Sequence, residues 1–252
     1  MTAIVWTPPN GMSAGSALAR FARECGFDPG DYDSLHRWST GDPGAFWSAI
    51  WDFAGIVGTK GDTAFVPDPA RWMTGARFFP DARLNLAENL LRQEGDRVVV
   101  VETDESGFRR DITADELRAE VARVSRGLRA SGVTAGDRVG VILPNRLECL
   151  VTLLATAAIG AVWTSCSPDF GTAAILDRIG QVRPKILIVQ PQYRYAGRDH
   201  DISDRLQDIV AGMEGVERIV VVGESSFETD KPVIRYETFG SDGPLEFTRV
   251  GF

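Results

Sequence analysis

Apolar and polar residues in the second half of the chain follow a regular alternation of two patterns. Short apolar runs rich in Val and Ile alternate with longer segments whose apolar residues recur at helical spacing. The runs predict strands at 138–143, 161–165, 185–189 and 218–222, separated by helices at 145–159, 172–182 and 202–213. Apolar strands separated by helices indicate a mostly parallel sheet covered on both faces, and therefore a layered α/β fold.

The clearest single helix precedes this alternation. Thr113 and Glu116 have the spacing of a capping box, and behind them apolar residues recur at steps of four, three and four as far as Leu128. Gly132 marks a suitable end, since glycine commonly stops helices. The segment therefore predicts a long amphipathic helix that packs its apolar side against the sheet.

Further predicted elements lie upstream of this helix and at the end of the chain. Residues 81–92 predict another helix, with Leu86, Leu90 and Leu91 on one side. The valine run at 98–101 predicts a strand that pairs with 108–112 across a short turn. The tail from 232 to 252 has strand-like pieces without a clear end.

Aromatic residues are concentrated in the first eighty residues. Five of the six tryptophans lie there: Trp6, Trp38, Trp47, Trp51 and Trp72. Asp42 and Pro43 predict the start of a helix, with Asp as the N-cap and Pro at the first helical position. Large aromatic side chains usually serve burial, so we interpret the tryptophans as packing groups. The change in composition predicts an N-terminal extension at 1–80 and an α/β domain at 81–252.

Residues 149–168 carry no charge, and their number alone would fit a membrane span. Several Thr, Ser and Gly residues interrupt the segment, which we interpret as a buried helix followed by a strand. The first ten residues have no positive charge and contain two prolines, so they do not resemble a signal peptide.

Charge and composition exclude several classes of function. Lys and Arg number 27 against 35 Asp and Glu, which gives a net charge of −8, so neither nucleic acid nor a membrane is the expected partner. Cys25, Cys149 and Cys166 stand far apart, which fits a reducing cytoplasm. Only two histidines are present, and they form no cluster with the cysteines, so we expect no metal site. Composition thus favours a cytoplasmic protein that acts on small molecules.

Known nucleotide and nucleophile motifs are missing from the sequence. It has no GxGxxG after a strand, no GxxxxGK[ST] and no GxSxG. Ligands of parallel sheets gather beyond the carboxyl ends of the strands, which here lead into 144–145, 166–171 and 190–199. The residues alone therefore predict a site for a small anion in these loops, without a reaction.

Several short motifs, in this order and spacing, resemble the adenylate-forming enzymes, and among them the short-chain acyl-CoA synthetases. They are ITADEL at 112–117, GDRV at 136–139 with NxxE at 145–148, and AIGAV at 158–162. WDFAGI at 51–56 and LNLAENLL at 84–91 are similar to the acetoacetate-activating members. Acetyl- and propionyl-activating members are the alternative within the family. The resemblance extends from about residue 21 onward.

The resemblance implies a two-step ligase. Acetoacetate and Mg²⁺-ATP would give an acyl-adenylate and pyrophosphate, and coenzyme A would then attack to give the thioester and AMP. The family's phosphate loop, [ST][ST]GTTGxPK, its adenosine motifs and its C-terminal lysine domain have no counterpart in these 252 residues. The resemblance therefore covers an N-terminal extension and the first half of the large domain, and it implies no catalytic residue here.

The intact protein would accordingly need ATP, Mg²⁺ and coenzyme A, whereas this chain alone would contact only coenzyme A. Its partner would be the missing C-terminal half of the same polypeptide. Apolar Phe247, Val250 and Phe252 favour a chain that continues. Two alternatives remain open. One is a non-catalytic module that binds coenzyme A, and the other is a folding or docking unit with a structural role.

One ligand contact of the family falls within the chain. Relatives hold the coenzyme A phosphates with a Gly-Arg pair, which matches Gly197 and Arg198, with Arg194 displaced by one position, and with the loop that contains Ser167. Arg198 is the strongest candidate because a guanidinium matches phosphate geometry. Alternatively, Arg198 is a solvated residue that pairs with Asp199 or Asp201. Asp169, in the same loop as Ser167, argues against a tight phosphate contact there.

Overall fold

The computed structural model describes residues 5–7, 9, 11–71, 73–224 and 227–251. The chain divides into two compact units. One comprises residues 1–83 with 251–252, and the other comprises residues 84–250. The second unit contains the predicted parallel sheet and all the residues expected to contact a ligand.

Three helices form the centre of the first unit. They are α1 (Ala17–Glu24), α2 (Tyr32–Gly41) and α3 (Pro43–Ala54). Each begins at a side-chain cap, supplied by Ser16, Asp31 and Asp42 respectively. These oxygens accept hydrogen bonds from backbone N–H groups that a helix leaves unpaired at its start. The predicted start of α3 at Asp42 and Pro43 is confirmed.

Aromatic side chains fill the interior of this unit. Phe21 is buried and lies edge-on to Phe46, with ring centroids 5.9 Å apart, while Trp38 packs against both. Trp51 is buried as well and packs against a ring of Phe79. The packing role is therefore confirmed for these two tryptophans. Trp47 is partly exposed but also packs edge-on against Phe46 and Phe78, whereas Trp6 is exposed and Trp72 lies outside the described residues.

Several short strands follow α3 in the chain, and one lies near the C-terminal end of the described residues. They are β1 (Gly58–Thr59), β2 (Phe65–Val66), β3 (Arg77–Phe78), β4 (Arg83–Leu84) and β14 (Val250–Gly251). The prediction of one helix over 81–92 is wrong: α4 spans only Leu86–Leu90. Asn85 starts it by accepting a hydrogen bond from the Glu88 N–H. Leu86 and Leu90 are exposed, whereas Leu91 is buried.

An antiparallel hairpin and a long helix open the main part of the second unit. The hairpin pairs β5 (Val98–Thr103) with β6 (Arg109–Thr113), as predicted. α5 (Ala114–Ala130) follows, and Thr113 and Glu116 form the expected capping box. Gly132 follows the helix with a φ of 78°, a conformation that favours glycine.

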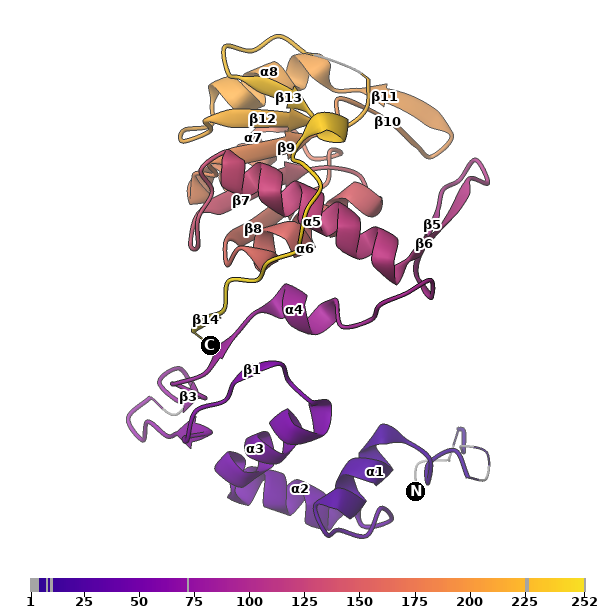
Figure 1. The fold of residues 1–252 in the computed structure, drawn as a ribbon, viewed down its shortest axis with the longest axis vertical. Coiled ribbons are helices and arrows are strands. Elements are labelled where there is room, and N and C mark those ends of the chain that lie inside the picture. The colour runs from indigo at the N-terminus through magenta and orange to yellow at the C-terminus, as the bar shows by residue number, and fades with distance from the viewer. Residues whose placement is uncertain (1–4, 8, 10, 72, 225–226, 252) are drawn as a thin grey trace. The chain divides into compact units, whose positions relative to one another are not determined.

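Five parallel strands form the sheet of the second unit (Figure 1). They are β7 (Arg138–Ile142), β8 (Val162–Cys166), β9 (Ile186–Val189), β12 (Arg218–Val221) and β13 (Val233–Arg235), and the order across the sheet is β13-β12-β9-β7-β8. The four predicted strands and their parallel pairing are confirmed. The fifth strand comes from the tail, followed by a 3₁₀ segment, η2 (Tyr236–Thr238).

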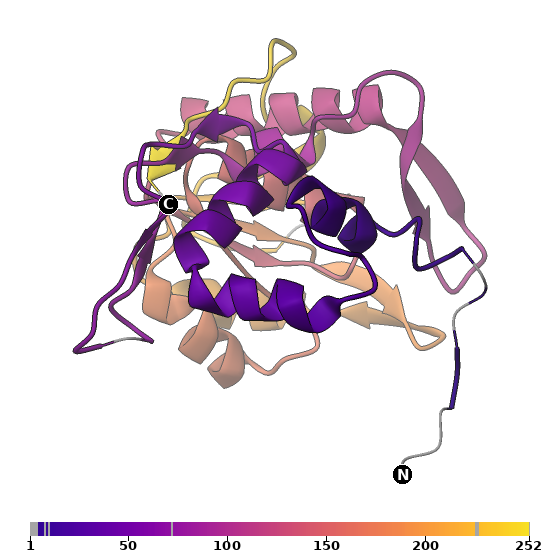
Figure 2. The same ribbon diagram turned by 90° about the horizontal axis from the view of Figure 1, so that it is seen from below.

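Helices cover both faces of this sheet (Figure 2). α5 and α6 (Leu147–Ala158) pack on one face, and α7 (Thr172–Arg178) and α8 (Ser203–Ala211) pack on the other. Ile186 and Ile188 belong to the first core, and Leu187 and Val189 to the second. The strand is buried on both sides, which explains its continuous apolar run.

One predicted helix of the second unit differs from the structure in its extent. The segment predicted as a helix at 172–182 contains α7 and a separate 3₁₀ turn, η1 (Gly180–Val182), shortly before Pro184. The uncharged segment 149–168 contains most of α6 and all of β8, as interpreted from the sequence. Within the described part of the chain, the structure has no helix that is long and apolar enough to cross a membrane.

Candidate functional site

The candidate site lies beyond the carboxyl ends of β7, β8 and β9. The chain reverses its order across the sheet at β7, since β8 lies on one side of it and β9 on the other. Such a reversal leaves a crevice between the loops that diverge from neighbouring strands. A cavity of about 400 Å³ occurs there, lined by Pro144, Asn145 and residues 103–105, 167–169 and 193–195. The cavity lies at the edge of the sheet where the sequence predicts a site.

A β-hairpin follows β9 where the sequence predicted only a loop. β10 (Gln192–Tyr195) pairs antiparallel with β11 (Arg198–Asp201). Its two-residue turn consists of Ala196 and Gly197, whose φ angles are 52° and 72°. Positive φ at both central residues is the geometry that suits the twist of paired strands. The hairpin thereby carries Arg194, Gly197 and Arg198 out beyond the sheet.

The register of the hairpin separates the two candidate arginines. Arg194 lies opposite Asp199, whereas Arg198 lies opposite Tyr195. Because successive side chains of a strand point to opposite faces, Arg194 and Arg198 belong to different faces of the hairpin. Sequence proximity alone would have grouped them, but the two guanidinium groups cannot approach one anion from the same face.

Tyr193 connects the hairpin to the loop after β8. Its hydroxyl donates a hydrogen bond of 2.7 Å to Asp169 Oδ1, and its ring stacks on His200 with centroids 5.1 Å apart. Burial and this hydrogen bond raise the pKa of Tyr193 to about 12. Hydrogen bonds from Tyr193 and Ser167 hold the pKa of Asp169 below its ordinary value. Tyr193 was missed by the sequence reasoning, which considered only charged and small residues here.

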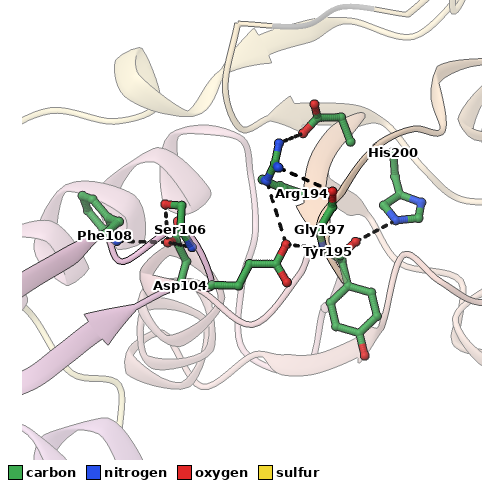
Figure 3. A network of polar contacts seen from close by, with 9 residues as sticks. Asp104, Ser106, Phe108, Arg194, Tyr195, Gly197 and His200 are labelled. Carbon is green, nitrogen blue, oxygen red and sulfur yellow. Dashed lines mark hydrogen bonds and ion pairs between the residues drawn. The ribbon is translucent and has the colours of Figure 1, made fainter.

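Three of the predicted ligand contacts are engaged within the protein. The Ser167 hydroxyl donates to Asp169 Oδ2 at 2.8 Å. Arg194 forms an ion pair of 2.9 Å with Asp199, and the Gly197 N–H donates to Glu105 Oε1 at 2.8 Å (Figure 3). A ligand would have to replace these internal partners in order to use the same groups.

Arg198 differs from the other candidates. It is exposed, and among the residues that the structure describes it has neither a hydrogen-bonded side-chain partner nor an ion pair. Arg198 is solvated, as the alternative expected, but the structure shows no pairing of it with Asp199 or Asp201. Asp199 pairs with Arg194, and Asp201 accepts hydrogen bonds from the Gln192 side chain and a backbone N–H. Arg198 therefore remains available for an anion from outside.

The charges around the cavity limit its chemistry. Asp104, Glu105 and Asp169 line it together with Arg194. The described residues contain no group of three or more His, Cys, Asp or Glu side chains that could hold a metal ion. The arrangement offers a backbone N–H group and a guanidinium group that suit an anion.

Several known proteins that are similar to this chain are named as CoA synthetases. Acetoacetyl-coenzyme A synthetase of Rhizobium meliloti (strain 1021) is 40% identical over 261 residues, which cover 98% of this chain and 39% of that protein. Malonamoyl-CoA synthetase of Penicillium aethiopicum is 31% identical over 268 residues, or 98% and 37% of the two chains. The solved structure of acetoacetyl-CoA synthetase from Streptomyces lividans matches with a TM-score of 0.89 at 33% identity. The match covers 98% of this chain and 39% of that chain.

The chain thus spans 39% of the length of the Rhizobium meliloti and Streptomyces lividans proteins. A family model described as AMP-binding enzyme matches residues 86–242, which include the sheet, its helices and the β10–β11 hairpin. The matched segment is more than half of the chain. The protein therefore belongs to the AMP-binding enzymes.

Proposed function

We propose that this chain is the N-terminal portion of a ligase that activates acetoacetate with Mg²⁺-ATP and transfers the acyl group to coenzyme A. The 40% identity to an acetoacetyl-coenzyme A synthetase over 98% of the chain is the observation that carries the proposal. Residues 1–80 would be the N-terminal extension, and residues 81–252 the first half of the large AMP-binding domain. We also propose that the protein is cytoplasmic, because its three free cysteines fit a reducing compartment.

A second acyl substrate has one observation in its favour. The similarity to a malonamoyl-CoA synthetase also covers 98% of the chain. Malonamate and acetoacetate share a carboxylate one carbon away from a second carbonyl group. The substrate class that both relatives support is therefore a short acid with a β-carbonyl, and acetoacetate is the member that we put first. Activation of acetoacetate, a ketone body, would serve lipid metabolism.

Within this chain, we propose that Arg198 contacts one phosphate of coenzyme A, and that Arg194, Gly197 and Ser167, on the side of the cavity, contact another. Arg198 is exposed on the hairpin beside the cavity, with no internal partner among the described residues. A guanidinium forms strong, paired hydrogen bonds to phosphate oxygens. The other three groups would have to exchange internal hydrogen bonds for the ligand.

The test is an assay of the protein encoded by the whole reading frame, with the substitution Arg198→Ala. We expect acetoacetate-dependent AMP formation to exceed that with malonamate, acetate or propionate. The substitution should raise the KM for coenzyme A about tenfold, which is the scale of one charge-assisted hydrogen bond. Acetoacetate-dependent exchange between ATP and pyrophosphate needs no coenzyme A and should remain unchanged. The 252-residue chain alone should form no AMP.

Arg183→Ala is the matched control. Arg183 is an exposed arginine that precedes β9, at the amino edge of the sheet, opposite the site. It should leave the KM for coenzyme A unchanged. Equal effects of both substitutions would contradict the role of Arg198, and preference for another acid would overturn the proposed acyl substrate.

A further inference from the structure

A carboxylate from a distant hairpin occupies the turn between β10 and β11. Glu105, at the tip of the β5–β6 hairpin, accepts a hydrogen bond of 2.8 Å from the Gly197 N–H, although the two residues are 92 positions apart. The same Glu105 oxygen lies 3.9 Å from Nε of Arg194. In Figure 3, the two residues that this carboxylate contacts, Arg194 and Gly197, lie close together at the turn. The contact therefore joins two hairpins that are separate in sequence.

The donors around Glu105 are those that would bind a phosphoryl group. A backbone N–H in a tight turn and a guanidinium both favour an anion. Ala196 and Gly197 have positive φ angles, which orient this N–H outward from the hairpin tip. The Glu105 carboxylate is thus an anion already seated at these donors, and it stands in for an external one.

The hairpin that carries Glu105 is held in a defined conformation. Asp104 Oδ1 accepts hydrogen bonds from the Ser106 N–H at 2.8 Å, the Ser106 hydroxyl at 2.6 Å and the Phe108 N–H at 3.1 Å. The Ser106 hydroxyl contributes most to a pKa of Asp104 below its ordinary value, and the charge of Arg194 adds to this effect. The turn therefore presents Glu105 toward the second hairpin.

The contact itself is open to solvent. The Glu105 side chain is 38% exposed and that of Arg194 is 53% exposed. Ion pairs at such positions contribute little to stability because water screens them and both side chains lose freedom. An incoming phosphate, which carries more charge than a carboxylate, can therefore displace Glu105 without unfolding either hairpin.

We propose that Glu105 is a reversible gate on the anion site at Arg194 and Gly197, and that it competes with a phosphate of coenzyme A. This inference rests on the proposed function for the identity of the ligand. The carboxylate would reduce the affinity of the free site, and its departure on binding would separate the tips of the two hairpins. Glu105 is thus a residue that sets affinity and selects against weakly charged anions, without touching the reacting atoms.

The test measures binding of coenzyme A to the 252-residue chain by calorimetry, with the backbone amide signal of Gly197 followed by NMR. Glu105→Gln removes the charge and keeps an acceptor oxygen, and Glu105→Ala removes both. We expect Glu105→Gln to lower the Kd about threefold to fivefold, the scale of one exposed ion pair. Glu105→Ala should lower it further, and coenzyme A should shift the Gly197 signal in all three proteins.

Glu217→Gln is the matched control, because Glu217 is an exposed glutamate just before β12, at the amino edge of the sheet. This substitution also removes one negative charge, but at a position distant from the β10–β11 turn, so it should not change the Kd for coenzyme A. If coenzyme A binds but the Glu105 variants bind equally well, the gate is refuted while the proposed coenzyme A site stands. If coenzyme A does not bind, but inorganic pyrophosphate shifts Gly197 more readily in Glu105→Gln, the gate stands and the proposed ligand is wrong. Binding of neither probe overturns both.

Discussion

At the scale of single residues, the link between Tyr193 and Asp169 determines how the hairpin meets the β8 loop. Asp169→Asn should lower the pKa of Tyr193 from about 12 toward its ordinary value of 10.0, because it removes a charged acceptor. Ultraviolet titration of the phenolate measures this change, with Tyr193→Phe to identify the signal. An unchanged titration would show that burial alone sets this pKa.

The raised pKa of Tyr193 also makes the stability of the folded protein depend on pH. The folded state holds the Tyr193 proton more tightly than the unfolded chain does. The hydroxyl therefore contributes stability fully below pH about 10, and this contribution is lost as the pH rises toward 12. The free energies of unfolding of the wild type and of Tyr193→Phe, measured with a chemical denaturant, should therefore become more similar as the pH rises over this range.

The sequence identified some site residues but not their arrangement. Ser167 and Arg194 do line the cavity, as their place after β8 and β9 predicted. The opposite faces of Arg194 and Arg198 depend on the hairpin register, which the Ala196–Gly197 turn sets. That turn lacks the Asn-Gly or Asp-Gly pair by which such hairpins are usually found in sequences, so the segment was expected to be a loop.

At the scale of elements, the capping box of α5 shows how local sequence sets helix stability. The Thr113 hydroxyl accepts from the Glu116 N–H, and the Glu116 carboxylate accepts from the Thr113 N–H. Thr113→Ala should lower the free energy of unfolding by about 1 kcal/mol. Thr172→Ala is the control, since Thr172 is half-buried like Thr113 and α7 begins without a side-chain cap. Equal losses in both variants, measured by urea unfolding, would argue against the box.

Elements with strong local signals were predictable, and elements fixed by distant contacts were not. α5 has its own cap and apolar stripe, so sequence alone located it. α4 is short, and its two exposed leucines suggested a helix face that the structure does not bury. Its start depends on Asn85, whose side chain is fixed by parts of the chain far away in sequence. Periodicity cannot reveal such contacts.

At the scale of the whole second unit, Asn85 connects three segments of the chain. It is 2% exposed, and its amide nitrogen lies 2.7, 3.1 and 2.8 Å from the carbonyl oxygens of Ala157, Ala158 and Thr248. The end of α6, the start of α4 and the tail of the unit thus depend on one side chain. The sequence motif that contains Asn85 contributed to the family resemblance without indicating this structural role.

Two substitutions of Asn85 test whether its side chain stabilises the unit as a hydrogen-bond donor or only by filling space. Asn85→Ala should lower the free energy of unfolding by about 3 kcal/mol, because buried carbonyl groups lose their partner. Asn85→Asp keeps the shape but places a carboxylate against three carbonyl oxygens, so its loss at neutral pH should be larger, about 4 kcal/mol. Burial raises the pKa of the new carboxyl in the folded state, so the stability of this variant should increase as the pH falls and the group becomes a donor. Urea unfolding at several pH values, with exposed Asn145→Ala as the control, measures both effects. An Asn85→Ala variant as stable as the Asn145→Ala control would mean that the contacts of Asn85 do not hold the unit together.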